Sequence, residues 1–510
     1  MSYAETDVLV LGGGMAAAWA AIGAARAGVR VIVADKGVMG TSGVTATAGP
    51  NHWFVPEEGR EAAVQARLQS ALGLGDGGWM HRILAQTWET LPSLAPFYEF
   101  CVNDAGATVY SSVRGPEYMR ALRQYVASLG VTILDHAPAL ELLLQGDGAV
   151  AGARGEHLRD GGLWEIRANA VVLATGGCGF LSHLLGSRTN TGDGYLMAAE
   201  TGVPLSGMEF SAQFTIAPAF STMTRAMSYV FATYYTEDGR ALFPEAEPMN
   251  VVFLAKALRE GPVYCDLSRM PRDIRERLPT ISPNVMPVFR RRNIDPFRDR
   301  FPISLVAEGT IRGVGGLRVE TEDCETSTPG LFAAGDAASR ELVTGAISGG
   351  GAVNAAWALS SGIWSGRAAA RRPRRSSAVR PAGQAGLRPY GAVKALDAKA
   401  LGREASDIAT DFSTTYFRTE TTLKDALSRL NGQWQEVAQH LAGGVRAREA
   451  AALTATARWC LTAALNRRES RGMHRREDFP ETAMHLARRQ VLRGIGEIES
   501  SFADAEELAA

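Results

Sequence analysis

The chain has 510 residues and a formal net charge of -1, from 53 basic and 54 acidic side chains. A chain of this length forms two or three domains with sizeable hydrophobic cores. The balanced charge gives no overall field that would attract nucleic acid or an acidic membrane surface. The five cysteines are scattered without a CxxC pair, which argues against an iron–sulfur cluster, a structural zinc and a disulfide scaffold. We therefore expect no nucleic-acid partner, no metal site and reduced thiols.

The sequence also predicts a protein of the cytoplasm. No uninterrupted apolar stretch reaches the length of a membrane span, so no span is expected. The apolar run near the N-terminus is interrupted by glycines and is needed as a first strand, which argues against a signal peptide.

Residues 7–36 are the segment around which the rest of the chain is organised. An apolar run at 8–11 is typical of a buried parallel strand, and three glycines follow at 12–14. The alanine-rich stretch 15–27 predicts a helix, and the apolar run 29–34 predicts a second strand. Strand, glycines, helix and strand together are the layout of a dinucleotide-binding unit.

The glycines match the dinucleotide fingerprint Gly12-x-Gly14-x-x-Ala17. Gly12 allows the tight turn, Gly14 lets the backbone approach a pyrophosphate, and Ala17 permits close packing of helix on strand. The phosphates are expected at the helix N-terminus, where free N–H groups of Gly13 and its neighbours favour anions. Asp35 follows the second strand, where a carboxylate accepts ribose hydroxyls. The alternative is a glycine turn that binds nothing.

Beyond this unit, the loop 36–49 is rich in Gly, Ser and Thr, which suits a backbone wrapped around a ligand. The remaining pattern predicts helices at 60–100 and 117–129, short strands at 131–135, 139–145 and 150–153, and a buried strand running into glycines at 170–177.

Four stretches, in order along the chain, carry a resemblance to a known family. The first is the fingerprint. The second is VLATGG at 172–177, followed by TNTGDGY and MEF, and the third is GLFAAGDAA at 330–338, with 345–354 after it. The fourth is ESRGMHRREDFP at 469–480. Together they resemble the FAD-binding family of fumarate reductase and succinate dehydrogenase flavoprotein subunits, which includes L-aspartate oxidase and adenylylsulfate reductase.

The resemblance implies an α/β fold with a Rossmann-like FAD-binding domain, discontinuous at 1–205 and 330–372. It implies an inserted α+β capping, or substrate, domain at 206–329 and a helical C-terminal domain at 390–510. Residues 371–389, rich in arginine with Pro, Ser and Gly, are expected to form an exposed linker, and a basic nucleic-acid tail is the alternative.

The resemblance also implies FAD as the cofactor. Members with covalent flavin carry a histidine where this chain has Gly43, so non-covalent FAD is expected. Gly335 and Asp336 resemble the second FAD signature, whose acid binds the ribityl hydroxyls. The residues that the resemblance assigns to FAD are Gly12, Gly13, Gly14, Ala17, Asp35, Lys36, Thr41, Ser42, Gly43, Ala174, Thr175, Gly176, Asp193, Gly335, Asp336, Ser348, Gly351 and Ala352.

At the substrate site the sequence departs from the family at three places. Members that act on dicarboxylates use histidine, threonine and arginine side chains to neutralise and polarise two carboxylates. Here no histidine follows MEF within 208–218, and Glu308 falls at a polarising position. Thr344 and Ser348 fall where the family has a further histidine and the carboxylate-binding arginine. Succinate, fumarate and aspartate are therefore not the expected substrates.

Three residues are the catalytic candidates. Glu308, beside flavin, could accept a proton from a C–H, N–H or O–H group. Arg312 could bind a carboxylate or carbonyl, or it could simply pair with Glu308. Arg225 lies near the place of the family's arginine proton donor, and a surface or ion-paired arginine is the alternative. Arg340 and Glu341 could also face the pocket.

The sequence therefore predicts an FAD-dependent oxidoreductase that transfers a hydride between flavin N5 and a small-molecule substrate. The chemistry would be desaturation or reduction of a C–C bond next to a carbonyl, or oxidation of a C–N bond. One alternative is an oxygen-using oxidase like L-aspartate oxidase. Another is a flavoprotein subunit that docks an electron-transfer partner protein, and the last is a flavin-binding scaffold without catalysis.

Overall fold

The protein is described here by a computed structural model, which covers residues 1–224, 229–243, 250–281, 285–373, 378–383, 396–440 and 444–503. The chain forms two compact units. The first comprises Met1–Leu181, Gly186–Gln213 and Glu308–Ala510, and the second comprises Ser182–Leu185 and Phe214–Ala307.

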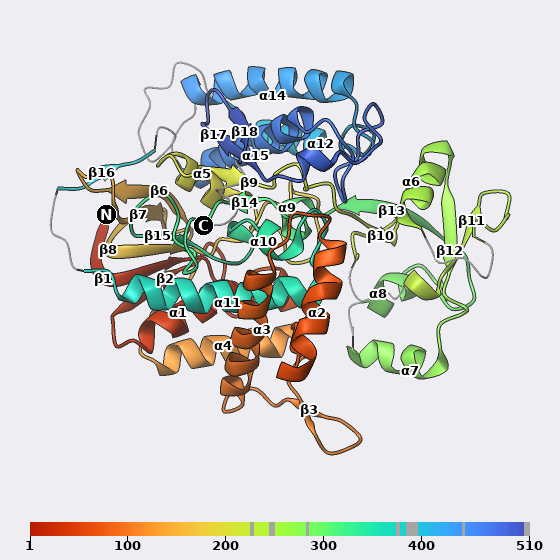
Figure 1. The fold of residues 1–510 in the computed structure, drawn as a ribbon, viewed down its shortest axis with the longest axis horizontal. Helices are drawn as coiled ribbons and strands as arrows, with labels where there is room; N and C mark the ends of the chain where they lie inside the picture. The colour runs from red at the N-terminus through yellow and green to blue at the C-terminus, as the bar shows by residue number, and fades with distance from the viewer. Residues whose placement is uncertain are drawn as a thin grey trace. The chain divides into compact units, whose positions relative to one another are not determined.

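A mixed sheet lies at the centre of the first unit (Figure 1). Its strands are β1 (Ser2–Leu11), β2 (Val31–Ala34), β5 (Thr132–Leu134), β6 (Ala139–Leu144), β7 (Val150–Glu156), β8 (Leu163–Leu173), β15 (Leu331–Ala333) and β16 (Arg380–Pro381). The order is β16-β6-β7-β8-β1-β2-β5, with β15 paired to β8. In the parallel part, Val8 of β1 lies opposite Val31 on one side and Ala170 on the other. Strands buried in this way need the continuous apolar runs that the sequence shows.

Two helices of the first unit cross at very close range. These are α1 (Met15–Ala25) and α11 (Gly350–Ala370), which run beside each other in Figure 1. A Cβ atom at Gly366 would lie 2.1 Å from the carbonyl oxygen of Ala20, so only glycine permits this approach. Helix α3 (Gly77–Thr90) packs against α11, and α4 (Gly115–Ser128) packs against α1. The first unit also contains α2 (Glu57–Ser70), the short helices η1 (Val44–Thr47) and η2 (Leu91–Leu94), and the hairpin of β3 (Cys101–Val102) and β4 (Thr108–Val109).

The C-terminal part of the first unit is mainly helical. It contains α12 (Ala398–Thr410), α13 (Phe412–Thr415), α14 (Glu420–His440), α15 (Val445–Asn466), η5 (Met484–Leu486), β17 (Gln490–Arg493) and β18 (Glu499–Phe502). The two strands join β9 (Leu205–Ser206) and β14 (Gly316–Leu317) in a sheet of order β14-β9-β17-β18. Helix α15 also packs against α5 (Asp193–Ala199). The elements from α12 to β18 thus belong to the same unit as the predicted FAD segments.

The second unit is an α+β unit with its own core. Four antiparallel strands, in the order β10-β13-β12-β11, carry buried residues such as Phe301 and Cys265, which pack with Leu254 and Phe289 of the helices. Its elements are β10 (Phe214–Pro218), η3 (Tyr229–Phe231), β11 (Thr233–Thr236), α6 (Val251–Glu260), β12 (Val263–Asp266), α7 (Arg272–Ile281), α8 (Val285–Arg290) and β13 (Phe301–Ala307).

The predicted α/β class is confirmed. The second unit is shorter at both ends than the range 206–329 predicted for the capping domain, because β9 and β14 belong to the sheet of the first unit. Within the predicted linker 371–389, Arg380–Pro381 pairs with β6 as an edge strand, while 374–377 and 384–389 lie outside the described residues. In the described parts of the chain, no helix is both long and apolar enough to cross a membrane.

Candidate functional site

The glycine turn between β1 and α1 has the geometry that its fingerprint predicts. Gly12 has a φ of +118°, and a Cβ atom there would lie 2.2 Å from the carbonyl oxygen of Ala174. Gly14 precedes α1, whose first N–H groups donate to no capping side chain among the described residues. A Cβ atom at Gly14 would meet no protein atom within 4 Å. The turn therefore presents helix N–H groups to open space, as an anion site requires. Ala17 is buried against the core.

Asp35 lies directly against this turn. A Cβ atom at Gly13 would be 2.3 Å from Oδ2 of Asp35, and the Ser42 hydroxyl donates a hydrogen bond to the same carboxylate oxygen. Burial raises the pKa of Asp35, while the Ser42 hydrogen bond acts in the opposite direction. Gly43 has a φ of +77°, and a Cβ atom there would lie 3.6 Å from Gly14 Cα. Two of the predicted FAD residues of this loop, Ser42 and Gly43, therefore lie next to the fingerprint glycines and Asp35. Thr41, in contrast, is exposed and bonds to the Val38 carbonyl.

Lys36 is turned toward the C-terminal helices. Its Nζ lies 2.8 Å from both Thr191 Oγ1 and Asp193 Oδ2, and 2.6 Å from Oε1 of Glu449 on α15. Burial favours the neutral amine, but the two carboxylates outweigh it and raise the pKa of Lys36. Lys36 and Asp193 therefore form an ion network that ties the FAD segments to α15, and their direct contact with FAD stays a prediction.

The strand of β8 continues into the second predicted FAD segment. Ala174 N donates to the Leu11 carbonyl at 2.9 Å, which places 174–176 beside the fingerprint. The hydroxyl of Thr175 is buried and has no hydrogen-bond partner in the described part of the protein. A Cβ atom at Gly176 would be 2.2 Å from Nδ2 of Asn190, so that turn also needs glycine.

The second signature forms η4 (Gly335–Ala337) at the same place. A Cβ atom at Gly335 would be 2.7 Å from Ala16 Cβ of α1, and the Gly335 carbonyl accepts a 2.9 Å hydrogen bond from Trp357 of α11. The Asp336 carboxylate pairs with the buried Arg340. The structure thus brings the two signatures, which are far apart in the sequence, to the beginning of the two crossing helices.

The N-terminus of α11 completes the predicted cofactor site. Gly350 N donates to Ser348 Oγ at 3.3 Å, and Cβ atoms at Gly350 and Gly351 would meet nothing within 4 Å. The Ala352 carbonyl accepts a 3.0 Å bond from Trp53 N. Asn354 Oδ1 is buried without a partner among the described residues.

These features fit a bound dinucleotide. Open space adjoins the glycines at the N-termini of both α1 and α11, and the buried polar atoms Thr175 Oγ1 and Asn354 Oδ1 have no hydrogen-bond partner among the residues that the structure describes. Buried polar atoms are normally hydrogen-bonded, so such atoms beside a glycine cradle are suited to a polar ligand. The residues present therefore fit FAD.

Glu308 and Arg312 form the ion pair that the sequence left as an alternative. Glu308 is fully buried and precedes α9 (Gly309–Arg312), and its Oε2 lies 3.3 Å from Arg312 Nε. The side chain of Arg312 is 30% exposed. Beside them, Thr310 Oγ1 accepts a 2.7 Å bond from Cys178 N and lies 3.0 Å from the Tyr195 hydroxyl. A carboxylate and a guanidinium are thus held on a rigid turn.

Arg340 links this turn to the cofactor signature. Its guanidinium pairs with Asp336 and donates to the carbonyl oxygens of Thr310 and Gly313. Thr344 Oγ1 in turn donates to the Arg340 carbonyl at 3.0 Å. In the sequence, the spacing of four residues between Asp336 and Arg340 was the signal from which this ion pair could have been predicted. Arg225 lies outside the described residues, so its role stays a prediction.

Two further charged residues, Glu341 and Arg67, lie on helices next to these segments. Glu341 begins α10 (Glu341–Thr344) and accepts a hydrogen bond from Ser206, so it faces β9. Burial and the nearby Glu209 carboxylate raise the pKa of Glu341 to about 7. Arg67 of α2 reaches the loop between α10 and α11, and no local pattern marks it.

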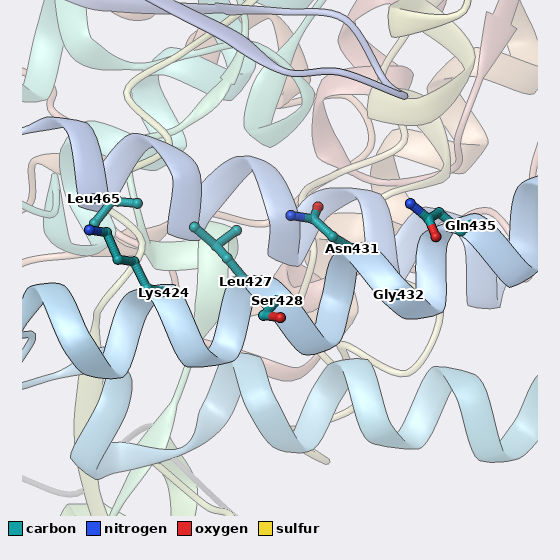
Figure 2. Close-up of a pocket in the computed structure, with 7 residues that line it drawn as sticks. All are labelled: Lys424, Leu427, Ser428, Asn431, Gly432, Gln435 and Leu465. Carbon is teal, nitrogen blue, oxygen red and sulfur yellow. The ribbon is translucent and has the colours of Figure 1, made fainter.

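A separate groove of about 570 Å³ follows one face of α14 (Figure 2). The described side chains that line it are amide, hydroxyl and aliphatic groups with one lysine. The lining residues are Lys424, Leu427, Ser428, Asn431, Gly432, Gln435 and Leu465.

Comparisons with known proteins identify the family. The FAD binding domain family matches residues 101–353, and the fumarate reductase flavoprotein C-terminal family matches residues 409–491. An L-aspartate oxidase of Mycobacterium bovis is 30% identical over 96% of this chain and 95% of its own length. An uncharacterized FAD-dependent oxidoreductase of Methanocaldococcus jannaschii is 27% identical over 96% of each chain.

Among solved structures, a variant of the E. coli quinol fumarate reductase FrdA has a TM-score of 0.82 at 21% identity, covering 99% of this chain and 97% of that chain. This likeness shows the fold. The predicted family and the predicted cofactor, FAD, are both confirmed. The chain belongs to the fumarate reductase and succinate dehydrogenase flavoprotein family and is an FAD-dependent oxidoreductase.

Proposed function

We propose that the enzyme transfers a hydride between flavin N5 and a small organic substrate that carries at most one carboxylate. The observation that carries the proposal is the loop from Thr344 to Ser348, whose side chains are all uncharged. Arg340 pairs with Asp336, and Arg312 pairs with Glu308. The Arg67 guanidinium, which also reaches this loop, donates to backbone carbonyls. Two carboxylates of one substrate would then lack the paired charges that a water-poor site requires.

The turn at 308–312 supplies the acid–base chemistry in this proposal. Bound FAD supplies the hydride acceptor or donor at N5. In the oxidative direction, Glu308 accepts the proton that the substrate loses from nitrogen or the adjacent carbon, while a hydride leaves the neighbouring carbon. Arg312 neutralises the Glu308 carboxylate or, when that pair opens, orients a substrate carbonyl. The reaction is desaturation next to a carbonyl, or oxidation of a C–N bond, or the reverse of either.

We further propose that FAD is held without a covalent bond and that the second unit acts as the capping domain. Gly43 stands at the position of the family's attachment histidine and has a φ of +77°, which favours glycine. We also assign the enzyme to the cytoplasm, where reducing conditions suit its exposed free thiol, Cys101.

An anaerobic absorbance titration tests this function. Purified protein with bound FAD is challenged in turn with dicarboxylates, amines and carbonyl compounds with one or no carboxylate. We expect only members of the last two groups to bleach the oxidised flavin bands, and acid precipitation to release the FAD. Rapid bleaching by succinate or aspartate would overturn the proposal.

The role of Glu308 is tested with a matched pair of variants. Glu308→Gln is expected to lower kcat/KM by about 10²- to 10⁴-fold with the substrate found above, because a positioned proton acceptor contributes about that much. Glu320→Gln removes a more exposed carboxylate, paired with Arg318 at 3.3 Å, and serves as the control. Equal activity of Glu308→Gln and the control would contradict the assignment.

A second candidate is an oxygen-using oxidase of the L-aspartate oxidase type, which the 30% identity to such an enzyme favours. It predicts bleaching by aspartate and release of peroxide in air. A third, a flavoprotein subunit that passes electrons to a partner protein, predicts co-purification of a cysteine-rich subunit and slow reoxidation by oxygen. Reoxidation kinetics with and without oxygen separate these acceptors.

A further inference from the structure

Arg67 joins two parts of the cofactor site from a helix that contains no FAD signature. It lies near the end of α2, and its guanidinium donates hydrogen bonds to three backbone carbonyls. The Nε atom lies 3.2 Å from the Val343 oxygen. The Nη2 atom lies 3.0 Å from the Thr344 oxygen and 3.5 Å from the Ser348 oxygen. One side chain therefore spans the whole turn between α10 and α11.

The end of α2 and this turn also pack without space between them. Gly345 has a φ of +60°, and a Cβ atom there would lie 2.0 Å from the Ala71 carbonyl oxygen. That oxygen accepts a 3.3 Å hydrogen bond from Ala346 N. From Ser348, the chain of contacts continues to Gly350 N at the beginning of α11. The position of the α11 N-terminus is thus connected to Arg67 through bonded neighbours.

Arg67 also supplies charge. Residues 344–351 contain no charged side chain, so the guanidinium that crosses their backbone is the positive group brought to this turn from α2. Burial lowers the pKa of Arg67, but an arginine stays protonated in proteins. Its charge adds to the partial positive charge at the N-terminus of the 21-residue helix α11.

We propose that Arg67 is a positioning residue for the flavin: it holds the turn that presents the α11 N-terminus to FAD and raises the reduction potential of the bound flavin. The physical reason is that two-electron reduction places negative charge on the flavin ring, and a fixed positive charge stabilises that form. The inference rests on the FAD assignment and does not depend on which substrate is used.

The test compares Arg67→Lys, which keeps a charge, with Arg67→Gln, which keeps a donor but removes the charge. Both are measured as full-length, FAD-loaded protein by reduction against a redox dye, with no substrate present. In Arg67→Gln, we expect the ratio of reduced to oxidised flavin at a fixed potential to fall at least tenfold, which is about 30 mV for a two-electron couple. Arg67→Lys should stay closer to the wild type.

Arg60→Met is the control, because Arg60 lies on the same helix but donates to the Val55 carbonyl at 3.3 Å. Equal potentials in the Lys and Gln variants would overturn the proposal, since the Lys variant keeps the positive charge and the Gln variant lacks it. If Arg67→Gln loses FAD, the proposal requires Arg67→Lys to retain FAD with a reduction potential near that of the wild type. Loss of FAD from both variants would contradict the proposal and show that Arg67 only supports the fold of the site. A wild type that binds no FAD would instead refute the cofactor site itself.

Discussion

At the scale of single residues, the fold changes the protonation of Glu341 in a way that stability measurements can follow. Its carboxyl is buried and faces Ser206 and the carboxylate of Glu209, with Arg467 and Arg489 as the nearby positive groups. Burial and the repulsion from Glu209 raise its pKa to about 7. The folded protein therefore holds a proton on Glu341 at pH values where the unfolded chain has released it.

This proton makes stability depend on pH. Below the ordinary glutamate range both states are protonated, and as pH rises through that range toward about 7 the folded protein becomes progressively less stable. The loss is on the order of 3 kcal/mol. Glu341→Gln mimics the protonated acid. At pH 5 its thermal unfolding midpoint should equal that of the wild type, and at pH 8 its midpoint should be higher than that of the wild type. Thermal unfolding of both proteins at the two pH values checks this, and parallel shifts would contradict it.

At the scale of elements, the glycine turn before α1 contains one position where the fold itself would accept a side chain. Gly14 has a φ of -78°, so an alanine fits its backbone, and its Cβ would point into open space. The turn needs a glycine here for the ligand and not for the fold.

Gly14→Ala should therefore fold normally and bind FAD at least tenfold more weakly, because the added methyl group occupies the space of the pyrophosphate. Fluorescence titration of the apoprotein with FAD measures the affinity, and thermal unfolding of the apoprotein measures the fold. Gly146→Ala, at an exposed turn where a Cβ also meets nothing, is the control. Unchanged FAD affinity in Gly14→Ala would place the pyrophosphate elsewhere.

Helix α15 is attached to the cofactor half by a buried ion pair. Arg448 Nη1 and Nη2 lie 2.6 and 2.5 Å from the two carboxylate oxygens of Glu200, and both side chains are almost fully buried. Removing one partner of such a pair leaves an uncompensated charge and costs about 3–5 kcal/mol.

Arg448→Met is thus expected to lower the thermal midpoint by several degrees. Arg429→Met serves as the comparison, because Arg429 pairs with Glu404 at the surface, with side chains 62% and 47% exposed. An exposed pair contributes about 0–1 kcal/mol, so this variant should behave like the wild type. Similar midpoints for the two variants would show that the buried pair does not secure α15.

At the scale of the whole molecule, the second unit is an insertion whose ends meet. The Glu308 N–H donates to the Gln213 carbonyl at 2.8 Å, so the two chain ends that flank 214–307 lie side by side within the first unit. The second unit has its own hydrophobic core. The first unit can therefore close without it.

Replacing 214–307 with a short glycine linker should leave a folded protein that binds FAD, because the predicted FAD residues all belong to the first unit. If the insert is the capping domain, the same protein should lose turnover. The flavin absorbance per protein and the rate of substrate bleaching are the two measurements. A shortened protein that binds no FAD would contradict the independence of the first unit, and one with full turnover would refute the capping role.

The sequence by itself determined the features that are local. The fingerprint, the buried strands and the long helices follow from periodicity and glycine placement within some thirty residues, and family motifs extended them to FAD. It gave no sign of the pairing of β17 with β9, because short strands far apart in the chain carry little pattern of their own.

Only the tertiary structure decided which charged side chains meet. Arg67 and Thr344 are 277 residues apart in the chain, and Lys36 pairs with Glu449 on α15. The sequence left open whether Arg312 binds a substrate group or pairs with Glu308, and the structure shows the pair with Glu308. The physical reason is that a long charged side chain takes its partner from whatever the packed core brings within reach, and neither hydrophobic periodicity nor a glycine motif encodes that choice.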